Sequence, residues 1–195
     1  METIETIGRG FFDQSTLWYH IRRAIGRPIL PPHAVKERLL IGHAAGISVL
    51  VETGTYLGHM VSAMQDQFER IYSIELAPEL ARKATARFAT NHSITILHGD
   101  SGTLLPEILD GIAQPCVFWL DGHYSGGATA MGETETPVLA ELRAILRHPY
   151  RNVILIDDAR LFTGTRTYPT VDELRAMLTG TGYRLTVSDD VIQIK

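Results

Sequence analysis

Five short apolar runs recur along the chain and constrain its fold more than any other feature. The runs span residues 47–52, 70–75, 94–99, 116–121 and 152–157. They are rich in β-branched or aromatic residues, which is typical of strands covered on both faces of a parallel sheet. The amphipathic segments between them, residues 59–68, 78–90, 102–112 and 136–146, are predicted helices. This alternation indicates an α/β fold with a doubly wound, mostly parallel sheet and helices on both faces.

The C-terminal part of the chain breaks the alternation. Residues 171–182 indicate a helix stopped by glycine, and residues 183–195 indicate two strands around a turn at Ser188, Asp189 and Asp190. Such a pair of strands predicts an antiparallel hairpin. Five parallel strands and this hairpin would make a seven-stranded, Rossmann-like sheet.

The N-terminal part differs from the rest of the chain. It indicates two helical pieces separated by Pro28, Pro31 and Pro32, because proline interrupts a helix. We therefore expect residues 1–44 to form an N-terminal helical cap and residues 45–195 to form the sheet domain.

Composition limits the classes of function. The 195-residue chain has a formal net charge of −4 and no run of five or six like charges, so no nucleic-acid partner is indicated. Its first residues lack the apolar core of a signal peptide, and no apolar run approaches the roughly 20 residues of a membrane span. We expect a cytoplasmic protein without a membrane or nucleic-acid partner, and a homodimer is left open.

Each apolar run ends at, or one residue before, an acidic residue. These residues are Glu52, Glu75, Asp100, Asp121 and Asp157. Open α/β sheets bind ligands outside the carboxyl ends of their strands. The acidic residues are therefore predicted to gather around a ligand at one edge of the sheet.

The turn after the first run indicates what this ligand is not. Gly54 and Gly58 let the backbone turn tightly and approach a ligand, but their spacing differs from the dinucleotide fingerprint. Tyr56 occupies the stretch that a pyrophosphate would need, and Glu52 stands just upstream. An acidic residue there suits a ligand with positive charge and amino groups.

The second and third runs add two further predictions. Glu75 follows Gly54 by 21 residues (75 − 54), the place for a carboxylate that binds two ribose hydroxyls. Asp100 and Ser101 would lie beside the same pocket and could serve an adenine edge. The alternative is that either residue caps the next helix.

The ordered set VETGTYLG, IYSIEL, LHGDS, FWLDGH and the terminal hairpin resembles the class I S-adenosylmethionine-dependent methyltransferases. The resemblance covers roughly residues 45 to 195 and identifies them as the methyltransferase domain. It implies S-adenosylmethionine as the cofactor. The cofactor-binding residues it implies are Glu52, Gly54, Thr55, Tyr56, Gly58, Glu75, Asp100, Ser101 and Asp121.

Asp121 and the Asp157–Asp158 pair would end adjacent strands, where their carboxylates repel one another unless a cation lies between them. Mg²⁺, a hard cation with oxygen ligands, is the predicted solution. The arrangement resembles the metal-dependent small-molecule O-methyltransferases of the catechol and macrocin type, in which the metal grips the acceptor hydroxyl. The alternative is that Asp158 pairs with Arg160 and Asp157 caps the following segment.

The sequence departs from these enzymes at three positions. Tyr124 replaces the lysine and Asp158 the asparagine of catechol-type enzymes, and His123 replaces an acidic residue of the sugar enzymes. His123 and Asp121 are the predicted catalytic residues, because the pKa of imidazole suits proton transfer near neutral pH. A metal ligand or a packed loop residue are the alternatives for His123.

Several polar residues of the N-terminal half are given no role. Lys36 and Arg38 are expected on a solvent-exposed helix face, and His33 and His59 show no metal-ligand spacing.

The leading hypothesis is a methyltransferase that moves a methyl group from S-adenosylmethionine to an oxygen of a small molecule, with Mg²⁺ assistance. A sugar or natural-product hydroxyl is the expected acceptor. The alternatives are a metal-dependent phosphoester hydrolase, which leaves Glu52 and Glu75 idle, and a catalytically silent protein that binds S-adenosylmethionine. A nicotinamide oxidoreductase is disfavoured by the glycine spacing.

Overall fold

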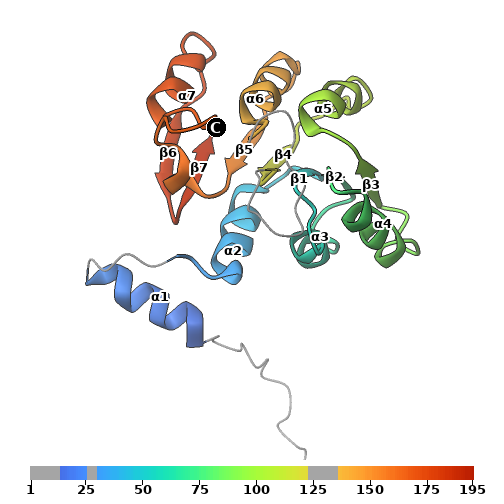
Figure 1. The fold of residues 1–195 in the computed structure, drawn as a ribbon, viewed down its shortest axis with the longest axis horizontal. Helices are drawn as coiled ribbons and strands as arrows, with labels where there is room; N and C mark the ends of the chain where they lie inside the picture. The colour runs from blue at the N-terminus through green and yellow to red at the C-terminus, as the bar shows by residue number, and fades with distance from the viewer. Residues whose placement is uncertain (1–13, 26–29, 123–135) are drawn as a thin grey trace, which may run out of the picture.

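A computed structural model describes residues 14–25, 30–122 and 136–195 of the chain. These residues form a seven-stranded sheet with helices on both faces (Figure 1). In sheet order the strands are β3 (Ile94–His98), β2 (Arg70–Glu75), β1 (Val49–Thr53), β4 (Val117–Leu120), β5 (Val153–Ile156), β7 (Val191–Ile194) and β6 (Leu185–Ser188). Neighbouring strands pair in parallel except β7, which is antiparallel to both β5 and β6. The predicted fold class, including the C-terminal hairpin, is confirmed.

Helices cover both faces of the sheet (Figure 1). The helices α2 (His33–His43), α3 (His59–Met64) and α4 (Pro78–Arg87) lie on one face. The helices α5 (Ser101–Asp110), α6 (Val138–Arg147) and α7 (Val171–Met177) lie on the other. A 3₁₀ turn, η1 (Ala159–Leu161), follows β5.

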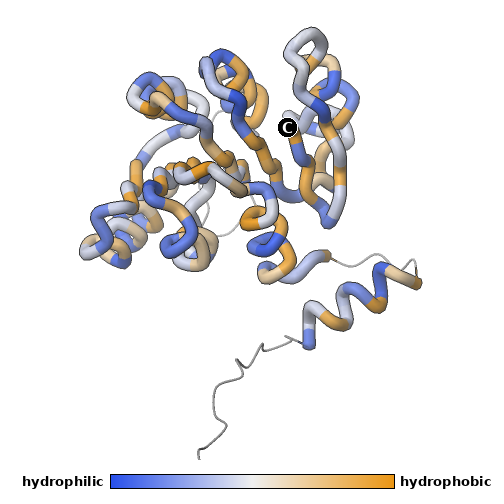
Figure 2. Tube along the Cα trace, turned by 180° about the vertical axis from the view of Figure 1, so that it is seen from behind, coloured by the Kyte–Doolittle hydropathy of each residue, from blue (hydrophilic) through white to orange (hydrophobic). Residues whose placement is uncertain are grey.

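The strands are apolar throughout because both of their faces are buried. In β4, Phe118 packs into the core beneath α5, α6 and α7, whereas Trp119 packs into the core beneath α2 and α3. Successive side chains of a strand point to opposite faces, so each strand contributes to both cores. The helices carry hydrophobic and hydrophilic residues along the same turns, as expected for elements with one buried face (Figure 2).

The N-terminal part forms two helices, as predicted. The first is α1 (Gln14–Ala24), and α2 follows with Pro32 as its N-cap residue. Leu40 of α2 is fully buried and packs with residues of α3 and β1. The second helix is thus part of the core, and the division into a cap over residues 1–44 and a domain over 45–195 stays a prediction. None of the described helices is long and apolar enough to cross a bilayer.

Candidate functional site

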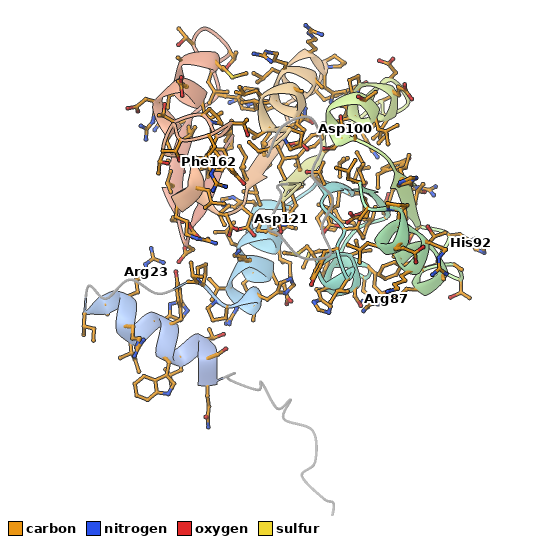
Figure 3. All side chains as sticks on the ribbon, viewed as in Figure 1. Arg23, Arg87, His92, Asp100, Asp121 and Phe162 are labelled. Atoms are coloured by element: carbon orange, nitrogen blue, oxygen red, sulfur yellow. The ribbon has the colours of Figure 1, made fainter. Side chains whose placement is uncertain are left out.

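The carboxyl ends of β1, β2, β4 and β5 lie along one edge of the sheet because these strands run parallel. A cavity of about 170 Å³ opens there between α2, α3 and the ends of β1 and β4. Six residues predicted from the sequence line it: Glu52, Gly54, Thr55, Tyr56, Asp121 and Asp157. Figure 3 shows Asp121 at the end of β4, beside α2.

Glu52, the fourth residue of β1, is a buried carboxyl group that lines the cavity. It accepts a hydrogen bond from Ser73 Oγ of β2, which lies 2.6 Å from Thr55 Oγ1. Burial raises the pKa of Glu52 to about 8, and the Ser73 hydrogen bond partly opposes this rise. The negative charges of Asp121 and Glu75 raise it further. In the free protein Glu52 is therefore largely protonated at neutral pH.

Glu75, at the end of β2, holds the turn that follows β1. Its Oε2 accepts a hydrogen bond from the backbone N–H of Tyr56 at 2.7 Å, and its Oε1 accepts one from Ala77 at 2.8 Å. Tyr56 has a left-handed backbone, with φ of 48°. Each carboxylate oxygen has two lone pairs, so both retain capacity for a further donor. Glu75 thus fixes the turn and can still accept hydrogen bonds from a ligand.

The left-handed backbone of both glycines confirms the predicted tight turn, and the structure adds a further reason for each glycine. Gly54 has φ of +84°, and a Cβ there would lie 2.2 Å from the carbonyl oxygen of Asp121. Gly58 has φ of +72°, and a Cβ there would lie 2.8 Å from the Phe88 ring. The close neighbours of both glycines are protein atoms. Gly54 therefore permits the close approach of the loops that follow β1 and β4.

Asp100 and Ser101 begin α5 and do not line the cavity. Asp100 Oδ1 accepts a hydrogen bond from the backbone N–H of Thr103 at 3.0 Å, so the alternative that it caps the helix is confirmed. Ser101 Oγ donates to Glu141 Oε1 of α6 at 2.6 Å. Figure 3 shows Asp100 apart from Asp121. Their contact with an adenine ring stays a prediction.

A lysine stands among the carboxylates that were predicted to hold a metal. Lys36 Nζ of α2 lies 2.6 Å from Asp157 Oδ2 and 3.3 Å from Asp158 Oδ1. Its side chain is only 15% exposed, so the expectation of a solvent-exposed face is wrong for Lys36, whereas Arg38 is exposed. Asp158 Oδ1 also accepts from Arg160 Nη1 at 2.7 Å, which confirms the predicted alternative for this residue.

The electrostatics favour an ion pair between Lys36 and Asp157. Burial by itself would lower the pKa of Lys36, but attraction to Asp157, Asp158 and Asp121 outweighs burial and leaves that pKa above its ordinary value. Burial raises the pKa of Asp157, and Lys36 offsets part of that rise. The two groups therefore stabilise each other's charged form.

This arrangement does not fit Mg²⁺. Asp157 Oδ2 faces the ammonium of Lys36, and Asp157 Oδ1 accepts the backbone N–H of Asp158 at 2.7 Å. Over residues 14–25, 30–122 and 136–195, no three His, Cys, Asp or Glu side chains are grouped to hold a metal ion. The premise of the metal prediction, three carboxylates with no cation between them, does not hold, because Lys36 supplies the cation.

The ion pairs continue away from the cavity toward α1. Arg160 pairs with Asp190 of the turn between β6 and β7 as well as with Asp158. The neighbouring Asp189 accepts a hydrogen bond from Tyr19 Oη of α1 at 2.7 Å and pairs with Arg23. The hairpin turn thus anchors α1, and η1 links the turn to the carboxylates beside Lys36.

Sequence reasoning missed part of the cavity wall. His33 and His59 both line it, with ring centroids 6.2 Å apart, and Trp119 closes it from the sheet. His33 and Glu37 lie four residues apart on α2, and His33 Nδ1 lies 2.5 Å from Glu37 Oε1. This spacing predicts their contact, but no signal in the sequence indicated that the two histidines line the cavity. His123, a predicted catalytic residue, lies outside the described residues.

The strand order is that of the class I methyltransferase fold. No family model and no curated protein matches the sequence. An O-methyltransferase from Bacillus cereus in complex with S-adenosylhomocysteine matches with a TM-score of 0.59 at 16% identity, covering 93% of this chain and 90% of that chain. The O-methyltransferase TomG from Streptomyces achromogenes, involved in tomaymycin synthesis and in complex with S-adenosylmethionine, matches with a TM-score of 0.58 at 18% identity, covering 98% and 91%.

A third similar structure acts on a different kind of acceptor. The 23S rRNA methyltransferase ErmE matches with a TM-score of 0.54 at 15% identity, covering 86% of this chain and 69% of that chain. The shared fold therefore includes an enzyme involved in tomaymycin synthesis and a 23S rRNA methyltransferase, and it does not select the acceptor.

The close approach at Gly54 gives a first prediction. Gly54→Ala should lower the free energy of unfolding by at least about 2–4 kcal/mol, from the clash with Asp121 and the left-handed backbone. Gly46→Ala is the matched control, because Gly46 has φ of +78° with nothing within 4 Å. It should cost only about 1–2 kcal/mol, which is the cost of the left-handed backbone by itself. Urea unfolding measures both, and equal losses would refute the clash.

The protonated state of Glu52 gives a second prediction. Because its pKa rises to about 8 in the folded protein from 4.5, the folded state holds an extra proton between these values. The contribution of Glu52 to the free energy of unfolding therefore falls as pH rises, by up to about 1.4 kcal/mol per pH unit. The Glu52→Gln variant has no carboxyl group to titrate and should lack this loss of stability. The free energy of unfolding of the variant should therefore increase relative to that of wild type from pH 5 to pH 8. A difference independent of pH in urea unfolding would contradict the assignment.

Proposed function

We propose that this chain is an S-adenosylmethionine-dependent methyltransferase that transfers a methyl group to an oxygen of a small hydroxylated molecule. The observation that carries the proposal is that Glu52, near the end of β1, and Glu75, at the end of β2, both lie beside the turn that contains Gly54. Glu52 and Gly54 line a cavity at the edge of the sheet where α/β folds bind ligands. The similar structures with bound S-adenosylmethionine or S-adenosylhomocysteine support this identification.

The proposed cofactor site uses residues at the ends of β1, β2 and β4. Glu75 would accept the ribose hydroxyls with the capacity that its two backbone hydrogen bonds leave. Glu52, largely protonated in the free protein, would ionise beside the positively charged methionine portion. The other cofactor-binding residues predicted from the sequence keep their assignments as part of the proposal. They are Gly54, Thr55, Tyr56, Gly58, Asp100, Ser101 and Asp121.

Methyl transfer from a sulfonium is an in-line displacement, in which the methyl carbon bonds to the acceptor oxygen as its bond to sulfur breaks. The cofactor supplies the reactive methyl group. The protein must orient the acceptor and take its proton. Asp121, which lines the cavity at the end of β4, is assigned to this task together with His123.

The predicted Mg²⁺ assistance is not part of the proposed mechanism. Its predicted ligands Asp157 and Asp158 are held by Lys36 and Arg160. The same observation removes the support for the phosphoester hydrolase, which needs a metal on these carboxylates. No observation favours that function.

The acceptor class, the cytoplasmic location, the absence of membrane and nucleic-acid partners and the homodimer stay predictions. The net charge of −4 and the acidic residues of the cavity support an acceptor other than a polyanion.

Calorimetry separates the proposed ligand class from the others. S-adenosylhomocysteine should bind with micromolar affinity, whereas NADH and a nucleoside triphosphate should not bind. A screen of hydroxylated metabolites with labelled methyl donor then distinguishes an enzyme from a silent binder. Binding of NADH in place of S-adenosylhomocysteine would overturn the proposal.

The role of Glu75 gives a third testable outcome within this site. Glu75→Ala should weaken S-adenosylhomocysteine binding by roughly 1.5–3 kcal/mol, the range for hydrogen bonds to a charged group. Glu79→Ala removes an exposed carboxylate of α4 and is the control, which should bind like wild type. Unchanged affinity in the Glu75→Ala variant would remove Glu75 from the site.

A further inference from the structure

The cavity has a cation of its own, brought by a helix that belongs to the N-terminal part of the chain. Lys36 and Asp157 both line the cavity, although 121 residues separate them. We propose that Lys36 is the resident cation of this carboxylate cluster and occupies the place that a divalent metal ion would need, so that the site works without one. The placement of Lys36 among the carboxylates does not depend on the proposed function; only the reaction that the site would carry out rests on it.

The geometry makes the lysine and a metal ion alternatives. Mg²⁺ binds carboxylate oxygens at about 2.0–2.1 Å. Lys36 Nζ lies 2.6 Å from Asp157 Oδ2, on the side of that oxygen that a metal shared with Asp158 would occupy. The other oxygen of Asp157 accepts a backbone N–H within the turn. A metal ion bound to Asp157 Oδ2 at that distance would lie no more than about 4.7 Å (2.6 + 2.1) from the ammonium, where the two positive charges repel each other.

The charges lead to the same conclusion. Lys36 faces both Asp157 and Asp158, and Arg160 is shared between Asp158 and Asp190, so both cations are already engaged by carboxylates. A divalent ion would add two positive charges and would leave the ammonium, only 15% exposed, without its partners. An unpaired buried charge is costly. The resident ammonium is therefore favoured over the metal ion.

Binding of Mn²⁺, which substitutes for Mg²⁺, tests this inference. The free ion gives a sharp electron paramagnetic resonance signal, which is measured with the full chain after treatment with a chelator. Four proteins are compared: wild type, Lys36→Met, the double variant Lys36→Met with Asp157→Asn, and Arg38→Met. The Arg38→Met variant removes the same charge from an exposed position of the same helix.

We expect wild type and Arg38→Met to leave Mn²⁺ free. Lys36→Met should bind one Mn²⁺ per chain, at least roughly tenfold more tightly than wild type. Adding Asp157→Asn should abolish this gain. The inference is overturned if folded Lys36→Met, checked by circular dichroism, gains no site.

Wild type alone also decides the question should Lys36→Met not fold. A stoichiometric Mn²⁺ site in wild type that Asp157→Asn removes would show that the metal displaces the lysine. Calorimetry with S-adenosylhomocysteine on the same samples keeps the two proposals separate. If wild type binds both S-adenosylhomocysteine and Mn²⁺, the proposed role of Lys36 is refuted and the proposed function stands. If wild type binds neither, the proposed function is refuted and the role of Lys36 stands.

Discussion

Negative charge buried at one edge of the sheet is the constraint to which the rest of the site responds. A carboxylate removed from water must be protonated, hydrogen-bonded or paired. Glu52 is largely protonated, Glu75 accepts two backbone N–H groups, and Asp157 pairs with Lys36. Each solution fixes a different part of the fold: the contact between β1 and β2, the turn after β1, and the position of α2. The acidic strand ends thus organise the site before any ligand binds.

The helix α2 shows how a segment outside the alternating pattern becomes part of the site. Val35 and Leu40 bury its apolar side, and this packing delivers Lys36 to Asp157 and His33 to the cavity. The chain of ion pairs through Arg160 and Asp190 then links this edge of the sheet to the terminal hairpin. The N-terminal part is therefore more than a cover, because it contributes charge to the cavity wall.

Sequence reasoning succeeded where the information is local. Continuous apolar runs predict buried parallel strands, and their polar ends predict the edge at which Glu52 and Asp121 meet. It failed where tertiary contact decides. Nothing near Lys36 in the sequence indicates a partner 121 residues away, and the three-carboxylate argument lacked that partner. The glycine turn lies between these cases: Gly54 was singled out correctly, but its reason, the Asp121 backbone, follows β4 and is visible only in the folded chain.

A lysine in the cavity raises the question of how the same cavity could accept the positively charged sulfonium of the proposed cofactor. The answer lies in how the charge of Lys36 is paired. Lys36 is paired with Asp157, and Arg160 is shared between Asp158 and Asp190, so these side chains present no net positive charge. Asp121 and Glu52 remain on the cavity wall, and Glu52 gains charge when a cation approaches, because the cation lowers its raised pKa. Glu52 therefore becomes more negative as a cationic ligand enters, whereas a phosphate would meet Glu52, Asp121 and Asp157 and a lysine that is already paired.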